Sequence, residues 1–187
     1  AFAAKDARAF PAIKGLIRCS VGLPDGKIRP HMALKLLGQE IDRQILPDGG
    51  HFQRNPSLHL FVLRQLLEIR ETIQASPANV PVSLQGAIDR MTPMLRGFRM
   101  GDGGLALFNG AHGEDRRTID AVLAQTGVKG RALTNAPHSG YQRLAAGRTV
   151  VVADTGDSFP GAHAHAGTLS FEMSIGKERL IVNCGGG

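Results

Sequence analysis

The chain has 187 residues, of which 42% are hydrophobic and 20% charged, a balance that predicts a globular protein with a substantial core. Lysine and arginine outnumber aspartate and glutamate by 22 to 16, and this excess favours a polyanionic partner. The low aromatic content of 5%, without tryptophan, and the dispersed basic residues exclude nucleic acid as the expected partner. No apolar run is long enough for a transmembrane segment.

The first two-thirds of the chain are predicted to be helical, because apolar residues return every three or four positions. The predicted apolar faces consist of Leu34, Leu37, Ile41 and Ile45; of Leu58, Val62, Leu66, Ile69 and Ile73; and of Leu84, Ile88, Met91 and Leu95. Proline and glycine separate these segments, and a further short helix is expected over 114–125. Successive helices with short connections indicate a helical bundle or solenoid.

From about residue 132 the pattern changes to a period of two, which is typical of strands. The predicted strands are 149–152, 168–175 and 179–182, with Gly176 and Lys177 as the turn of a hairpin. We therefore expect a helical domain over 1–130 and a β domain over 131–187. We also expect both to be truncated, because Ala1 lies within a helical pattern and Gly187 closely follows a strand.

His163 and His165 lie two residues apart, so in an extended strand both imidazoles project to the same face. The same parity predicts a buried side made of Leu169, Phe171, Met173 and Ile175, with Glu172 and Ser174 opposite. Two metal-competent groups beside an apolar face indicate a site. The alternative is that one histidine is exposed at the strand edge and the other lies in the core.

Five motifs occur in an order that resembles the bacterial heparinase II/III-like proteins. They begin at Ile45 (ILPDGGH), Gly101 (GDGGLALFN), Ser139 (SGYQRL), His163 (HAH) and Ile181 (IVNCG). The resemblance implies the C-terminal part of an incomplete (α/α) toroid followed by the start of an antiparallel β-sandwich. It also implies a polysaccharide lyase that cleaves uronic-acid-containing chains, such as glycosaminoglycans, by β-elimination in the periplasm or cell envelope.

The resemblance assigns His51 and His163 to catalysis. β-Elimination removes a proton beside the uronate carboxylate, so it requires neutralisation of that carboxylate, a base and a proton donor. His51 corresponds to the helical-domain histidine beside the uronate, and His163 to the sandwich histidine opposite it. His165 corresponds to a zinc ligand, and Asn183 occupies the place of a second ligand.

Tyr141, the single tyrosine, is a candidate catalytic acid, with a half-buried strand aromatic as the alternative. Arg54 is a candidate for binding a uronate carboxylate or sulfate, with a solvated arginine as the alternative. Asp102 is expected to shape the tight turn at Gly101–Gly104. Solvent or helix-end positions are predicted for the other histidines, which are His31, His59, His112 and His138.

Several positions depart from the family pattern and support a second interpretation. Gly50 stands where these lyases commonly have asparagine, Gly167 where an acidic residue is frequent, and Asn183 where the metal ligand is aspartate. The helical catalytic tyrosine of the family has no counterpart between His51 and Met100. The leading hypothesis is a lyase of acidic polysaccharides; the alternative is a catalytically impaired relative that binds acidic glycans or serves the cell envelope.

Overall fold

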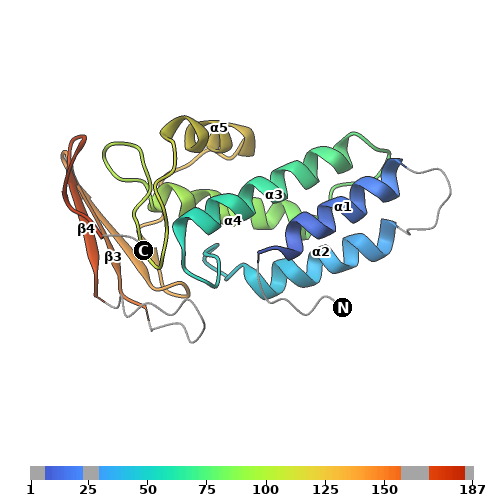
Figure 1. The fold of residues 1–187 in the computed structure, drawn as a ribbon, viewed down its shortest axis with the longest axis horizontal. Coiled ribbons are helices and arrows are strands. Elements are labelled where there is room, and N and C mark those ends of the chain that lie inside the picture. Colours follow the sequence, from blue (N-terminus) through green and yellow to red (C-terminus); the bar gives the residue numbers. More distant parts are fainter. Residues whose placement is uncertain (1–6, 23–29, 157–168, 184–187) are drawn as a thin grey trace.

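The computed structural model describes residues 7–22, 30–156 and 169–183, and these form a helical layer followed by one antiparallel sheet (Figure 1). The helices α1–α4 lie side by side along the long axis of the molecule, and the sheet stands across one end of them. The helices are α1 (Ala9–Gly22), α2 (Pro30–Gln44), α3 (Pro56–Gln74), α4 (Val82–Gly97) and α5 (Arg116–Thr126). The strands are β1 (Asn135–Ala136), β2 (Tyr141–Ala146), β3 (Thr149–Asp154), β4 (Phe171–Ile175) and β5 (Glu178–Ile181).

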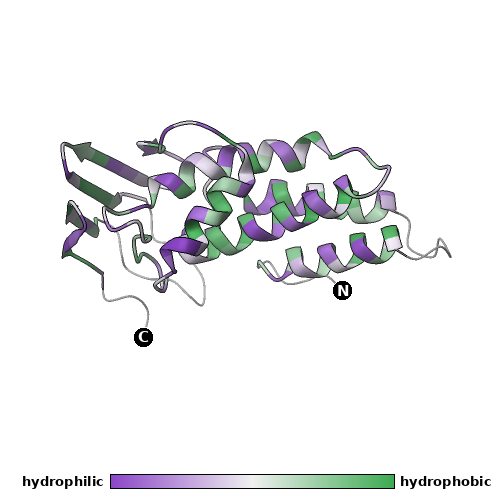
Figure 2. Ribbon diagram, turned by 90° about the horizontal axis from the view of Figure 1, so that it is seen from above, coloured by the Kyte–Doolittle hydropathy of each residue, from purple (hydrophilic) through white to green (hydrophobic). Residues whose placement is uncertain are grey.

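The helices form where the apolar periodicity predicts them, and their apolar faces make the core. Leu37, Leu66 and Ile88, one from each predicted face, are fully buried. Hydrophobic and hydrophilic residues lie on different sides of the helices (Figure 2). The start of α3 is fixed by Asn55, whose side chain accepts a hydrogen bond from the Leu58 amide at 2.9 Å. No helix in the described ranges is both long and apolar enough to cross a bilayer.

The sheet has the order β1-β2-β3-β4-β5, with every neighbouring pair antiparallel. The predicted hairpin is confirmed, because β4 pairs with β5 and Gly176 takes the positive φ of 59° that the connecting turn requires. The predicted strands correspond to β3, β4 and β5. The pattern did not predict β1 or β2, which add Tyr141 and its neighbours to the sheet.

The buried side of β4 is the opposite of the one predicted from alternation. Glu172 and Ser174 are fully buried, whereas Phe171 and Ile175 are each 42% exposed. The buried carboxylate of Glu172 accepts a hydrogen bond from the Leu107 amide at 2.8 Å. The hydroxyl of Ser174 accepts one from the Gly101 amide at 3.0 Å. The buried side is polar because it satisfies the backbone of the loop that follows α4.

A glycine in the loop after α2 provides a test of how that loop packs against α4. Gly49 has φ +85°, and a Cβ there would lie 2.1 Å from the Arg90 carbonyl oxygen. Gly49→Ala should therefore lower the free energy of unfolding by more than about 1 kcal/mol. Gly15→Ala, within α1 and with no atom within 4 Å of the added Cβ, should instead raise it by up to about 1 kcal/mol. Urea denaturation measures both, and similar effects of the two variants would contradict the described loop packing.

Candidate functional site

His51 lies in the loop between α2 and α3 and is buried, with 1% of its surface exposed. Its Nδ1 accepts a hydrogen bond from the Gln53 amide at 3.3 Å, so Nε2 carries the proton and donates to Gln44 Oε1 at 3.0 Å. Burial, with a smaller contribution from neighbouring His59, lowers the pKa of His51 to about 3. At neutral pH, His51 is an uncharged imidazole with both nitrogens bonded within the protein.

His59 is a second buried histidine, so a solvent position is wrong for it, whereas its place in the first turn of α3 agrees with the predicted helix-end position. Its Nε2 lies 3.0 Å from the Met91 carbonyl oxygen, while Nδ1 has no hydrogen-bond partner in the described part of the chain. Burial lowers its pKa to about 4, although the Met91 carbonyl and Asp48 favour the charged form. Its helical spacing with Val62 and Leu66, at positions three and seven residues on, is the pattern that could have identified it as a core residue.

Arg54 lies between the helical layer and the sheet, with 9% of its surface exposed. Its Nη2 forms an ion pair with Asp154 Oδ1 at the end of β3, and its Nε donates to the Ser139 carbonyl at 2.8 Å. The solvated alternative for Arg54 is therefore wrong. Burial raises the pKa of Asp154, and the charge of Arg54 opposes that change. The guanidinium thus joins the end of β3 and the β1–β2 connection to the loop before α3.

Tyr141, at the start of β2, belongs to the same cluster and is 3% exposed, so the half-buried alternative understates its burial. Its hydroxyl donates to the Arg54 carbonyl and accepts a hydrogen bond from Asn109 Nδ2 at 2.9 Å. Asn109 Nδ2 also lies 3.2 Å from Asp154 Oδ2. Burial raises the pKa of Tyr141, so the phenol keeps its proton and acts as a donor. Through Asn109, these contacts connect the loop after α4 to the sheet and to the loop before α3.

Asp48 also lies where the helical layer meets the sheet, a region that we call the junction. The sequence analysis did not single out this residue. Its Oδ2 accepts hydrogen bonds from the amides of His138 and Ser139, at 2.8 and 2.7 Å, and its Oδ1 accepts one from the Gly50 amide at 3.0 Å. A Cβ on Gly50 would lie 2.5 Å from Cβ of Ser139. The departure at Gly50 is thus explained by packing, because a larger residue here would displace the β1–β2 connection. An aspartate two residues before a bonded glycine amide is the local signal for such a turn.

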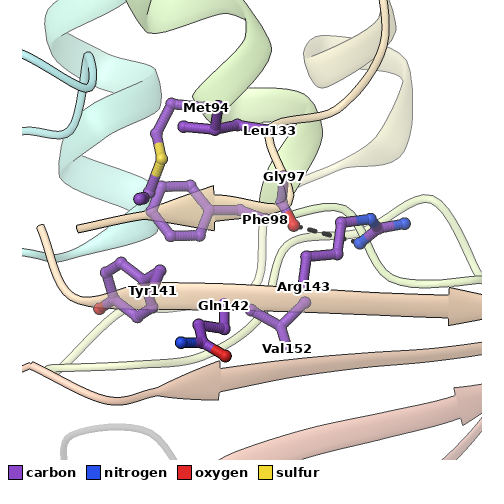
Figure 3. A pocket seen from close by; sticks show the side chains of 9 residues that line it. Met94, Gly97, Phe98, Leu133, Tyr141, Gln142, Arg143 and Val152 are labelled. Carbon is purple, nitrogen blue, oxygen red and sulfur yellow. Dashed lines mark hydrogen bonds between the residues drawn. The ribbon is translucent and has the colours of Figure 1, made fainter.

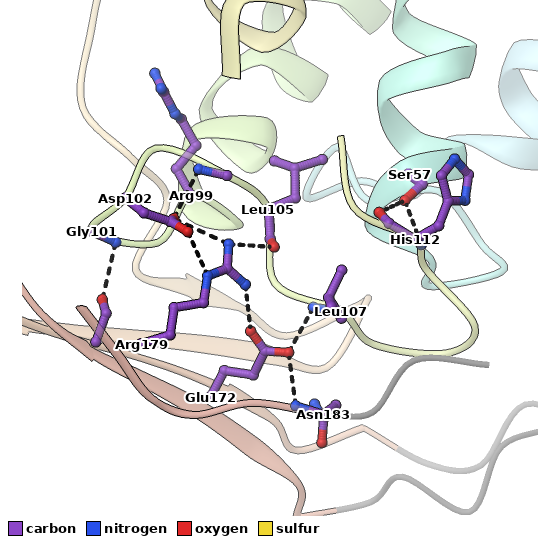
Figure 4. A network of polar contacts seen from close by, with 12 residues as sticks. Ser57, Arg99, Gly101, Asp102, Leu105, Leu107, His112, Glu172, Arg179 and Asn183 are labelled. Carbon is purple, nitrogen blue, oxygen red and sulfur yellow. Dashed lines mark hydrogen bonds and ion pairs between the residues drawn. The ribbon is translucent and has the colours of Figure 1, made fainter. Parts of the chain in front are cut away.

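A second polar cluster joins the Gly101–Gly104 turn to β4 and β5 (Figure 4). Arg179 donates from Nε to Asp102 Oδ2 at 2.7 Å and from Nη1 to Glu172 Oε2 at 3.2 Å. Burial opposes ionisation of Asp102, but the hydrogen bonds from Arg179 and Gly104 outweigh it, so its pKa is lowered. Asp102 also accepts from the Gly104 amide at 2.9 Å, which confirms that it shapes this turn. The cluster fixes the sheet against the loop through charged groups.

The predicted zinc ligands are divided between described and undescribed residues. Asn183 follows β5; its amide donates to Glu172 Oε1 at 3.1 Å, and its buried Nδ2 has no hydrogen-bond partner among the described residues. His163 and His165 lie outside the described residues. Within the described ranges, no three histidine, cysteine, aspartate or glutamate side chains are grouped to hold a metal ion. The nearby carboxylate of Glu172 already accepts hydrogen bonds from three N–H groups. A zinc site at His165 and Asn183 stays a prediction, because His165 is not described.

A small pocket lies between the end of α4 and strands β2 and β3 (Figure 3). It is lined by Met94, Phe98, Tyr141 and Val152 together with Arg143 and neighbouring residues. Its volume of about 10 Å³ is about that needed for one water molecule. This pocket is therefore too small for a sugar ring. The structure brings Arg54 and Tyr141 together where the helical layer meets the sheet, whereas the His51 side chain bonds to Gln44 and Gln53 within the helical layer.

Three comparisons relate this geometry to known proteins. Residues 128–187 match the family model described as "Heparinase II/III-like, C-terminal". The chain is 36% identical over 174 residues to "FtsZ-localized protein C" of Caulobacter vibrioides, a match that covers 91% of this chain and 30% of that protein. The chain therefore spans less than a third of this relative.

Two solved structures share the fold. A crystal structure of heparinase III superimposes with a TM-score of 0.78 at 14% identity, covering 96% of this chain and 35% of that one. The heparan sulfate lyase HepC from Pedobacter heparinus gives a TM-score of 0.75 at 18% identity, covering 94% and 32%. The predicted fold class, the end of an (α/α) toroid followed by the start of a β-sandwich, is confirmed.

The two buried histidines make stability depend on pH. Their pKa in the folded chain lies below 6.5, so the unfolded chain takes up protons first as the pH falls. Their contribution to stability is therefore intact above pH 6.5 and is lost on acidification, by about 2 kcal/mol per histidine at pH 5. Denaturation curves between these pH values should show a shallower decline for His51→Gln and for His59→Gln. The exposed control His31→Gln should keep the full decline; equal slopes in all variants would refute the assignment.

Removal of Arg54 tests the buried ion pair. Arg54→Met leaves the Asp154 carboxylate buried without its counter-charge and should lower the free energy of unfolding by about 3–5 kcal/mol at neutral pH. Asp154→Asn in the Arg54→Met background should restore part of this loss, because the amide carries no charge. Arg43→Met, at the more exposed pair with Glu40, should cost at most about 1 kcal/mol. A loss at Arg54 no larger than at Arg43 would show that the junction does not depend on this pair.

Proposed function

We propose that this chain, a segment of a heparinase II/III-like protein, serves the bacterial cell envelope at the division site and binds acidic glycan without cleaving it. The observation that carries this proposal is the state of the described candidate residues. His51, Arg54 and Tyr141 are all buried; His51 is bonded within the helical layer, and Arg54 and Tyr141 are bonded between that layer and the sheet.

Proton transfer in β-elimination favours groups whose pKa lies near the working pH and that reach the substrate. His51, with a pKa of about 3, is uncharged at neutral pH and cannot neutralise a uronate by charge. Tyr141, with a raised pKa, resists becoming a phenolate base. Either side chain would have to break buried hydrogen bonds to meet a sugar, at a cost of about 1–3 kcal/mol for each polar group left unpaired.

The relatives support a role in cell division. Identity is 36% to a protein whose name states that it is localised by FtsZ, against 14–19% to the heparinase III and heparan sulfate lyase structures. We therefore extend localisation with FtsZ to the whole protein of which this chain forms a part. The net charge of +6 supports an acidic glycan of the envelope as its ligand.

The second candidate function is lyase activity on a uronic-acid-containing polysaccharide, which the likeness to heparinase III over 96% of this chain favours. In this reading, His163 is the catalytic base facing the uronate, and His165 and Asn183 hold a zinc ion that stabilises the sandwich beside the site. Zinc in stoichiometric amounts in the purified protein would support that arrangement.

One set of measurements on the full-length protein separates the two functions. We expect a fluorescent fusion to co-localise with FtsZ at midcell. We expect no rise in ultraviolet absorbance from unsaturated sugar ends when the protein is incubated with heparan sulfate or alginate. An absorbance rise that His163→Ala abolishes at unchanged Tm, and that His31→Ala leaves intact, would establish the lyase and overturn the non-catalytic proposal. Diffuse fluorescence in dividing cells would overturn the division role.

A further inference from the structure

Cationic side chains from separate elements converge on two glycine turns at one end of the sheet. A Cβ on Gly103 would lie 2.9 Å from Arg116 Cδ and 2.9 Å from Arg99 Nη2. A Cβ on Gly104 would lie 2.6 Å from Arg179 Nη2. The absence of side chains at Gly103 and Gly104 therefore lets the arginines pack directly over the backbone of the first of these turns.

The β4–β5 turn continues the same surface. A Cβ on Gly101 would lie 1.8 Å from the Gly176 carbonyl oxygen, so the two turns are in direct contact. A Cβ on Gly176 would lie 2.5 Å from Arg148 Nη2 of the β2–β3 turn. Lys177 follows Gly176 and is exposed. We name this surface the basic ridge; it consists of Arg99, Arg116, Arg148, Lys177 and Arg179.

The charges of the basic ridge are only partly balanced. Arg179 is paired with Asp102 and Glu172, while Arg99 and Arg116 share Asp120. Within the described residues, Arg148 and Lys177 have no ion pair, and both are exposed. The side chain of Arg116 is 58% exposed. Arg99 and Arg179 hold the turns in place, and the more exposed Arg116, Arg148 and Lys177 remain available to a ligand.

We propose that the basic ridge is the binding surface for a linear acidic glycan carrying sulfate or carboxylate groups. This inference rests on the proposed glycan binding and names its site. The cations come from three turns or loops, the start of α5 and strand β5, and they lie along a surface rather than around an enclosed pocket, which suits a polymer with repeated anionic groups. Arginine is suited to such groups, because its planar guanidinium can bond both oxygens of a carboxylate or sulfate.

The composition of the ridge favours a glycan over a nucleic acid. A surface that binds single-stranded nucleic acid presents aromatic rings on which the bases stack. None of the five ridge residues is aromatic, Tyr141 is buried, and the partly exposed Phe171 lies at the other end of β4 from the Gly176 turn. The ridge therefore offers positive charge without rings on which bases could stack. Glu178, an exposed carboxylate next to Lys177, would weaken the attraction of the ridge for any anion.

The test measures binding of a labelled heparan sulfate oligosaccharide to the full-length protein by fluorescence anisotropy. Replacing three exposed cations, in Arg116→Gln/Arg148→Gln/Lys177→Gln, should raise Kd by at least about tenfold and flatten its salt dependence. A matched control, Lys35→Gln/Arg64→Gln/Arg90→Gln, makes the same charge change at exposed positions of α2, α3 and α4 and should alter Kd by less than about twofold. Glu178→Gln should lower Kd, a gain that misfolding cannot produce.

Each result bears on the basic ridge. An equal loss in the ridge and control variants, or unchanged Kd in both, would overturn the ridge while leaving glycan binding intact. Equally tight binding of single-stranded DNA of the same charge would overturn the assignment to a glycan. A wild-type protein that binds no acidic glycan would overturn both this site and the glycan-binding part of the proposed function.

Discussion

The buried ion pair between Arg54 and Asp154 is the interaction on which the junction of the two layers depends. Charges removed from water are tolerated only when each is paired and its remaining bonds are satisfied. Here Ser139 accepts from the guanidinium, and Asn109 donates to the carboxylate. The pair is thus one part of a network, and the loops around it are held in the positions that satisfy those bonds.

Polar bonding also explains which side of the sheet is buried. The loop after α4 presents backbone amides to the sheet, and Glu172 and Ser174 accept their hydrogen bonds. An apolar side in that place would leave the amides without partners. Phe171 and Ile175 consequently lie on the other side, where they are partly exposed in the described chain. Alternation correctly predicts that β4 has two different sides, but the partner of each side decides which one is buried.

The sequence predicted the helical layer well because apolar periodicity depends on local spacing, as at Leu66 and Ile88. It predicted less of the sheet: β1 has two residues, and β2 carries an alternation too weak to identify it. The motifs around His51, Arg54 and Tyr141 were found, and they do meet in space. Their bonding partners could not be predicted, because those partners lie up to 100 residues away in sequence.

The same sequence separation bears on how the chain folds. The Arg54–Asp154 contact joins a loop of the helical layer to a strand 100 residues later, so its formation carries the entropy cost of closing a long stretch of chain. Until it forms, each charge is hydrated separately and contributes nothing to holding the layers together. The change of apolar period predicts two domains, but the buried charges that they share should make them unfold together as one cooperative unit.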